Sequence, residues 1–235
     1  MKIEVWSDYV CPFCYIGKRR LEEALEETGL GDKAEIVFKA FQIDPNTPTT
    51  SDESIQEGLA KKYGMSVDET KKMTENVAAQ AKTVGLDYDF DNMKPANTFN
   101  AHRLAKLAEE QGISGEMSER LLRAYFIDAE AIGENDVLLR IAEEMGLDQN
   151  RTKAMLESDE FTTDVKNDIT EAGKIGVQGV PFFVINRKYG ISGAQSAEEF
   201  ASALRKVAAE EGVEPALKVL GEDAKGLCTD GSCEI

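Results

Sequence analysis

Histidine is almost absent from this 235-residue sequence, which contains only His102. A Ser-His-Asp or Cys-His hydrolase would have to use that residue, and the sequence has no Gly-x-Ser-x-Gly motif for a nucleophilic serine. A glycine-rich phosphate loop and a histidine–carboxylate cluster of the metal-binding kind are also missing. These absences argue against the common hydrolases and nucleotide-binding enzymes, and we predict no metal centre.

Long apolar runs are lacking as well. The longest covers residues 180–185, far short of the roughly 18 residues that span a bilayer. The 44 acidic and 27 basic side chains give a formal charge of −17, which argues against binding to nucleic acid or to an anionic membrane. Because no signal-peptide pattern follows Met1, we expect a cytoplasmic protein whose thiols are kept reduced.

Strand patterns occur only toward the two ends of the sequence, whereas apolar residues from about 50 to 173 recur with a helical period. The expected strands cover residues 2–7, 35–43, 180–185 and 189–192. The second is apolar on both faces, which favours a central position in the sheet. The order β-α-β, a long helical block and then β-β-α predicts an α/β fold with one sheet and an all-helical insertion.

This order divides the chain into four parts. Residues 1–46 and 175–212 form the sheet domain, and residues 47–174 form the helical insertion. Residues 213–235 are expected to be a flexible tail that carries Cys228 and Cys233.

Cys11-Pro12-Phe13-Cys14 lies between the first strand and a helix expected to begin near Pro12. Proline suits the first turn of a helix because its missing N–H would be unpaired there. Cys11 then occupies the helix N-terminus, where unpaired N–H groups and the positive end of the dipole favour a thiolate. Cys14 lies one turn further along and should be less exposed. The spacing predicts that Cys11 attacks and Cys14 resolves the mixed disulfide, with two incidental buried cysteines as the alternative.

Gly179-Val180-Pro181 directly precedes the third strand. A proline at the start of a central strand is unusual. It is explained if the Val180–Pro181 bond is cis and the Val180 backbone faces a bound substrate, although cis bonds are uncommon even before proline.

Several other residues are candidates for the walls of the substrate site. Asn97 and His102 lie on a helix expected to run from an Asn97 cap to Gly112, and they either line the substrate site or have a structural role. An apolar groove is expected from Phe13, Tyr9, Phe182 and the insertion, with Pro12 and Val180 beside it.

These features together resemble the DsbA-like branch of the thioredoxin fold. Residues 6–17 and 97–104 are similar to its FrnE-type subgroup. The resemblance implies a thioredoxin-like fold and thiol–disulfide exchange with protein or peptide substrates, with Cys11 as nucleophile and Pro181 as the cis-proline. Dithiol exchange requires no organic cofactor, and thioredoxin or glutathione could supply the electrons.

Two departures from the pattern and two alternative functions stay open. Phe13 stands where the well-known periplasmic oxidases have histidine, and Asp8 either points inward near Cys11 or lies in solvent. The same branch also resembles kappa-class glutathione transferases and 2-hydroxychromene-2-carboxylate isomerases, which use serine and glutathione at this site. A non-catalytic peptide-binding adaptor is the third function class.

The second cysteine pair, Cys228 and Cys233, is close to the C-terminus. Some FrnE-type proteins resemble this chain in carrying such a pair, and we expect it to exchange disulfides with Cys11 and Cys14. An adventitious disulfide in the tail is the alternative. Four cysteines are also compatible with a zinc site, but the pairs are over 200 positions apart and Pro12 favours a redox role for the first pair.

Overall fold

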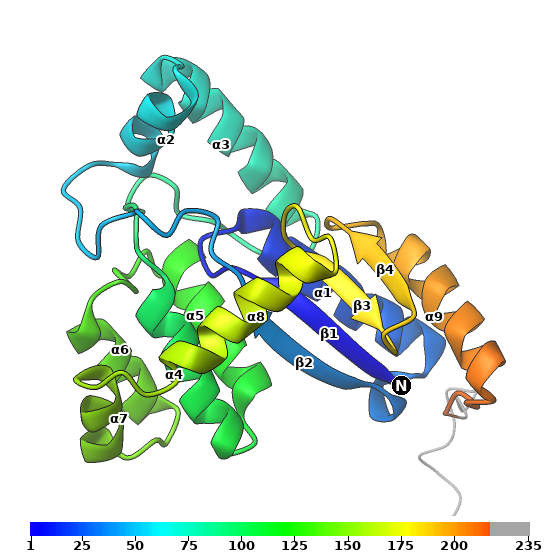
Figure 1. Cartoon of the computed structure of the whole chain (residues 1–235). Helices are drawn as coiled ribbons and strands as arrows, with labels where there is room; N and C mark the ends of the chain where they lie inside the picture. Colours follow the sequence, from blue (N-terminus) through cyan, green and yellow to red (C-terminus); the bar gives the residue numbers. More distant parts are fainter. Residues whose placement is uncertain (217–235) are drawn as a thin grey trace, which may run out of the picture.

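The computed structural model describes residues 1–216, in which four strands form one mixed sheet (Figure 1). The strands are β1 (Lys2–Ser7), β2 (Glu35–Ala40), β3 (Phe182–Ile185) and β4 (Tyr189–Ser192), in the order β2-β1-β3-β4. β1 runs parallel to β2, and β3 is antiparallel to both β1 and β4. The described residues therefore confirm the single sheet predicted from the two ends of the sequence.

Helices connect and cover this sheet. They are α1 (Pro12–Thr28), α2 (Ile55–Tyr63), α3 (Val67–Lys82), α4 (Phe99–Glu110), α5 (Ser114–Phe126), α6 (Asn135–Glu144), α7 (Gln149–Leu156), α8 (Thr162–Lys174) and α9 (Ala197–Glu211), with a short 3₁₀ turn at Gly31–Lys33. Capping boxes at Ser66 and Ser196 begin α3 and α9, because each serine accepts from the third backbone N–H and the glutamate there bonds back. Gly29 ends α1 in the left-handed conformation, with φ of 67°.

The two faces of the sheet are covered by different helices. α1 and α9 pack on one face, where Ile3, Val5 and Phe183 meet Leu21 and Phe200 in a shared core. α8 lies across the other face (Figure 1), where Trp6 packs with Ala172 and Val184. A helix thus covers each side of the central strands, which fixes the end of β1 and the start of α1 where the cysteine motif lies.

The insertion has its own apolar core, which continues onto the sheet domain. Leu104, Met117, Phe126 and Leu138 belong to one cluster that also includes Ile16 of α1. The insertion is therefore packed against the side of α1 that faces away from α9. No helix within residues 1–216 is both long and apolar enough to cross a bilayer.

Two expectations from the sequence differ from this architecture. β2 is an edge strand that ends at Ala40, not a central strand that reaches Ile43. It is apolar on both faces because helices of the insertion, rather than another strand, pack beside it. α8, which the predicted boundary at 174 assigns to the insertion, packs on the sheet: the Ala40 N–H donates to Asp168 Oδ2, and the Trp6 indole N–H donates to the Asp168 carbonyl.

Candidate active site

Cys11 and Cys14 lie at the start of α1, where β1 leads into the helix. Cys11 is the N-cap residue and Pro12 opens the first turn, as predicted. The Cys14 N–H donates to the Cys11 carbonyl at 3.0 Å, and the Cys11 N–H donates to the Asp8 carbonyl at 3.0 Å. Both thiols are free. The motif is therefore held in one tight turn that directs both side chains to the same side of the helix.

We expected Cys14 to be less exposed than Cys11, but the two residues differ little. Cys11 is 4% exposed and Cys14 is 3% exposed. Their surroundings differ more. Burial raises the pKa of the Cys14 thiol well above its usual value, and a hydrogen bond with Cys11 raises it further. Cys14 therefore stays protonated at neutral pH.

Cys11 faces the loop before β3. The Val180–Pro181 peptide bond is cis. The Cys11 thiol lies 3.4 Å from the Val180 carbonyl oxygen and donates to it. Cys11 and Val180 are thus neighbours despite a separation of 169 positions in the sequence.

Gly17 allows this approach. A Cβ at position 17 would lie 3.1 Å from Pro181 Cγ and 3.2 Å from Phe183 Cζ. A side chain there would push α1 away from the cis-proline loop, so Gly17 sets the distance between the two halves of the site. Sequence reasoning assigned it no role, since a glycine inside a helix is recognised as a contact point only once the facing surface is known.

A model of the DSBA-like thioredoxin domain matches residues 2–205. The chain belongs to this family. A curated relative, the uncharacterized protein YwbO of Bacillus subtilis, is 28% identical over 204 residues, covering 86% of this chain and 94% of YwbO. The crystal structure of a probable DsbA oxidoreductase from Streptomyces coelicolor is 35% identical, with a TM-score of 0.84 and 97% of each chain covered.

More distant solved structures share the fold alone. A 2-hydroxychromene-2-carboxylate isomerase is 14% identical, with a TM-score of 0.67, 90% of this chain covered and 98% of its own. The cytosolic disulfide reductase DsbM of Pseudomonas aeruginosa, solved with GSH, is 15% identical, with a TM-score of 0.63 and coverage of 89% and 100%. The thioredoxin-like fold predicted from the sequence is confirmed.

His102 lies behind the motif of this DSBA-like chain. It is 3% exposed, and its Nε2 lies 2.9 Å from the Phe41 carbonyl and 3.4 Å from Asp8 Oδ1. Its ring packs on Tyr9 with 4.7 Å between centroids. The ring of His102 is enclosed between the segment after β2 and the loop before Cys11. In this position His102 does not contact a substrate, as one of the two expectations for it had proposed.

Asp8 points inward, so the solvated alternative is wrong. The Ile43 N–H donates to Asp8 Oδ2 at 2.8 Å, and Oδ1 is buried with no hydrogen-bond partner among the described residues. The Asp8 carbonyl also accepts from the Cys11 N–H. Asp8 therefore links the segment after β2 to the cysteine turn.

The side chain of Asn97 forms hydrogen bonds with backbone groups and does not line the site. Its Nδ2 donates to the Pro45 and Thr47 carbonyls at 3.1 and 2.8 Å, and its Oδ1 accepts from the Phe99 N–H. Asn97 thus stabilises the loop after β2 and the start of α4, whose N-cap is Thr98.

The residues expected to form an apolar groove around the motif differ in their exposure. Phe13 is 38% exposed, while Phe182, Val180 and Pro12 are half-buried. Tyr9 is buried, with its hydroxyl 3.3 Å from Ser118 Oγ, so it does not line a groove. Pro12 and Phe13 lie within the cysteine motif and Val180 contacts Cys11, so these three residues stay our candidates for substrate contact. Phe182 packs against the cluster around Trp6.

Tyr88 is a site residue that the sequence did not indicate. Its hydroxyl donates to the Pro12 carbonyl at 2.8 Å, which holds the first turn of α1 against the insertion. Tyr88 lies in an irregular segment after α3, where no periodic pattern in the sequence indicates which way its side chain points. Cys228 and Cys233 fall outside the described residues.

Proposed function

We propose that this DSBA-like chain is a thiol–disulfide oxidoreductase that acts on protein substrates through Cys11 and Cys14. The observation that carries the proposal is the contact between the Cys11 thiol and the Val180 carbonyl beside a cis-proline. Cys11 is the N-cap residue of α1, so its sulfur lies at the positive end of the helix dipole. An extended substrate segment beside Val180 would bring a disulfide to that sulfur.

Exchange then proceeds in two balanced steps. The Cys11 thiolate attacks one sulfur of the substrate disulfide, forming a Cys11–substrate bond and breaking the substrate S–S bond, and the departing thiolate takes a proton from water. Cys14 loses its proton and attacks the Cys11 sulfur, which forms the Cys11–Cys14 disulfide and releases the second substrate thiol. The substrate gains two electrons and the dithiol loses two.

The reverse sequence oxidises a substrate dithiol, and the redox potential decides which direction dominates. In the reducing direction, thioredoxin or glutathione would return two electrons to the Cys11–Cys14 disulfide. The cytoplasm is our proposed location, and the FrnE-type subgroup is our proposed placement within the family.

Reduction of insulin in dithiothreitol tests the proposal. The wild-type chain should accelerate precipitation of the insulin B chain, and Cys11→Ser should abolish the acceleration. An acceleration that survives Cys11→Ser would contradict it. Peptide binding by a chain with no catalytic effect, and no change in binding with Cys11→Ser, would favour the adaptor alternative.

We also propose that Cys228 and Cys233 relay disulfides to the Cys11 pair. The described chain ends near Gly29, since the Ala216 N–H donates to the Gly29 carbonyl at 2.9 Å. The 17 residues of α1 separate that point from Cys11 by about 25 Å. The residues from 216 to 228 can extend to about 40 Å, which is enough to span the distance.

The double variant Cys228→Ser/Cys233→Ser tests this relay. We expect slower turnover with a protein disulfide while the first attack by Cys11 keeps its rate in a single-turnover experiment. Unchanged turnover would refute the relay without affecting the role of Cys11.

A glutathione-dependent isomerase is the second candidate, because a 2-hydroxychromene-2-carboxylate isomerase shares this fold. That chemistry predicts tight glutathione binding that persists in Cys11→Ser, since serine occupies this position in the isomerases. Titration calorimetry with reduced glutathione measures it. Binding that disappears with Cys11→Ser supports dithiol exchange instead.

A further inference from the structure

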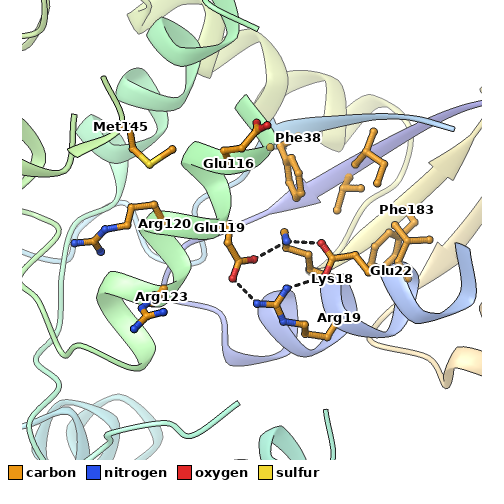
Figure 2. A pocket seen from close by; sticks show the side chains of 14 residues that line it. Lys18, Arg19, Glu22, Phe38, Glu116, Glu119, Arg120, Arg123, Met145 and Phe183 are labelled. Carbon is orange, nitrogen blue, oxygen red and sulfur yellow. Dashed lines mark hydrogen bonds and ion pairs between the residues drawn. The ribbon is translucent and has the colours of Figure 1, made fainter. Parts of the chain in front are cut away.

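A groove with a volume of about 640 Å³ lies between α1, α5 and the edge of the sheet, away from the cysteine turn (Figure 2). Its floor is apolar, formed by Val5, Leu21, Ile36, Phe38 and Phe183. Ile36 and Phe38 stay half-exposed although they face the same side as the α1–α9 core. The floor therefore offers apolar surface that a ligand could remove from water.

A network of ion pairs links α1 to α5 along one side of this groove. Glu119 of α5 accepts from Lys18 at 2.5 Å and also pairs with Arg19, and both cations pair with Glu22 (Figure 2). The Tyr15 hydroxyl donates to Glu119 at 2.5 Å. Because Tyr15 follows Cys14, this network lies between the groove and the cysteine turn and fixes their relative position.

The charge of the groove lining differs in sign from that of the chain. Four basic and three acidic side chains line it, in a protein with a formal charge of −17. Arg123 is 59% exposed, and its Nε lies 3.5 Å from Asp128 Oδ2. Among the described residues, Arg123 forms this one ion pair, through Nε. Both of its Nη groups are therefore available to an incoming carboxylate. The groove thus complements a ligand that is apolar with an acidic side chain.

The edge of β2 favours an extended polypeptide as that ligand. The N–H of Glu35 donates to the Met1 carbonyl and that of Phe41 to the Ser7 carbonyl, both on the β1 side. The alternate residues of β2 therefore point their backbone groups outward. Ala40 donates outward to Asp168, but within residues 1–216 the outward N–H of Ile36 has no such partner. Helices of the insertion pack beside the C-terminal part of β2, so the open part of this edge is near Ile36. An unpaired N–H there, next to the apolar floor, can accept a hydrogen bond partner from an extended polypeptide laid along the start of the strand.

We propose that this groove binds an extended, apolar stretch of the substrate polypeptide that carries an acidic residue, and so holds the substrate while Cys11 reacts. This proposal rests on the proposed function. Lys18 and Glu22 lie seven and eleven residues beyond Cys11, about 10 to 16 Å along α1. At about 3.3 Å per residue, the reacting substrate cysteine lies three to five residues from the bound stretch.

Binding of a thiol-free polypeptide tests the groove without using the cysteines. The probe is reduced, carbamidomethylated α-lactalbumin, which is unfolded and acidic, and its affinity is measured by fluorescence anisotropy with the full chain. Arg123→Glu should weaken binding about fivefold or more, because it replaces attraction by repulsion. Arg205→Glu makes the same charge change at a side chain outside the groove and should leave the affinity within about twofold.

Two substitutions at Ile36 test whether the outward N–H of β2 pairs with the bound polypeptide. Ile36→Ala shortens the side chain and keeps the outward N–H, whereas Ile36→Pro also removes the N–H without breaking a bond to β1. The proline variant should bind the probe more weakly than the alanine variant. Equal affinity of the two, with displacement of the probe by dodecanoate, would assign the groove to small amphiphiles and overturn the proposal. Dimerisation that Arg123→Glu abolishes would assign it to a second copy and also overturn it.

Turnover separates this inference from the proposed function. Arg123→Glu should raise KM for a protein disulfide and leave turnover of oxidised glutathione unchanged. Normal probe binding by Arg123→Glu, with glutathione disulfide turnover intact, would refute the groove alone. A wild-type chain that binds the probe but exchanges no disulfide would refute the proposed function and keep the groove.

Discussion

The sulfur of Cys11 lies 3.4 Å from the carbonyl oxygen of Val180, across the gap between α1 and the loop that precedes β3. This contact joins the first and last parts of the sheet domain, which the helical insertion separates in sequence. It places the backbone beside the cis-proline within reach of whatever binds to Cys11. The reaction therefore depends on the distance between α1 and that loop as much as on the two thiols.

Removing the resolving thiol should trap the intermediate. In Cys14→Ser, Cys11 can attack a substrate disulfide but no neighbouring thiol can release it, so a mixed disulfide accumulates. Non-reducing electrophoresis and mass spectrometry of the linked peptide measure it. The same adduct formed at Cys14 in the matched Cys11→Ser variant would reverse the assigned roles.

Gly17→Val should separate the two halves of the site. The added side chain begins 3.1 Å from Pro181 Cγ, so the helix or the loop must shift, at a cost of about 1–3 kcal/mol in the free energy of unfolding. Disulfide exchange with a protein substrate should slow as well. Gly173→Val in α8 is the matched control, since a Cβ there meets nothing within 4 Å. Equal urea midpoints and equal exchange rates for the two variants would show that Gly17 does not set this distance.

The second step of exchange should depend on pH through Cys14. Burial raises the pKa of this thiol well above its usual value, so only a small thiolate fraction exists at neutral pH. Below a raised pKa that fraction grows about tenfold per pH unit, so release of the second substrate thiol should accelerate as pH rises. Single-turnover kinetics from pH 6 to 9 measure this release. A rate that is constant above pH 7 would contradict it.

Stability should fall in acid through Asp168. Burial alone would raise the pKa of this carboxyl, but hydrogen bonds from Lys106 and Lys39 outweigh burial and lower it. A carboxyl whose folded pKa is lowered stabilises the fold above its unfolded pKa, near 4, and the contribution disappears as pH falls through the folded pKa. Asp168→Asn should therefore cost about 1–3 kcal/mol at pH 7, and this difference from wild type should shrink toward pH 2.

Urea unfolding at several pH values measures the contribution of Asp168. Asp164→Asn on the same helix is the control, because Asp164 is exposed and should change stability little at any pH. A difference between wild type and Asp168→Asn that stays constant down to pH 2 would contradict the assignment.

The sequence predicted the parts of this molecule that depend on local chemistry. Pro12 after Cys11 marked the helix start. The cis bond at Pro181 was predictable because proline is unusual at the start of a buried central strand. In each case the residues that decide the structure are neighbours in the sequence.

Features that depend on what packs against a segment could not be predicted in this way. Strand β2 is apolar on both faces, but this pattern does not distinguish a neighbouring strand from covering helices. Helical spacing places His102 one turn from the start of α4 without showing that its ring faces Phe41 and Asp8. The inward carboxylate of Asp8 likewise depends on the Ile43 N–H of a distant segment.

A redox titration of Cys11 and Cys14 tests the central claim most directly. The chain is equilibrated in glutathione buffers of increasing oxidised fraction, quenched in acid, and mapped by mass spectrometry for each disulfide. We predict one reversible two-electron transition that joins Cys11 to Cys14, present in wild type and in Cys228→Ser/Cys233→Ser. Thiols at 11 and 14 that never join in any buffer, while the chain still reduces insulin, would contradict the account.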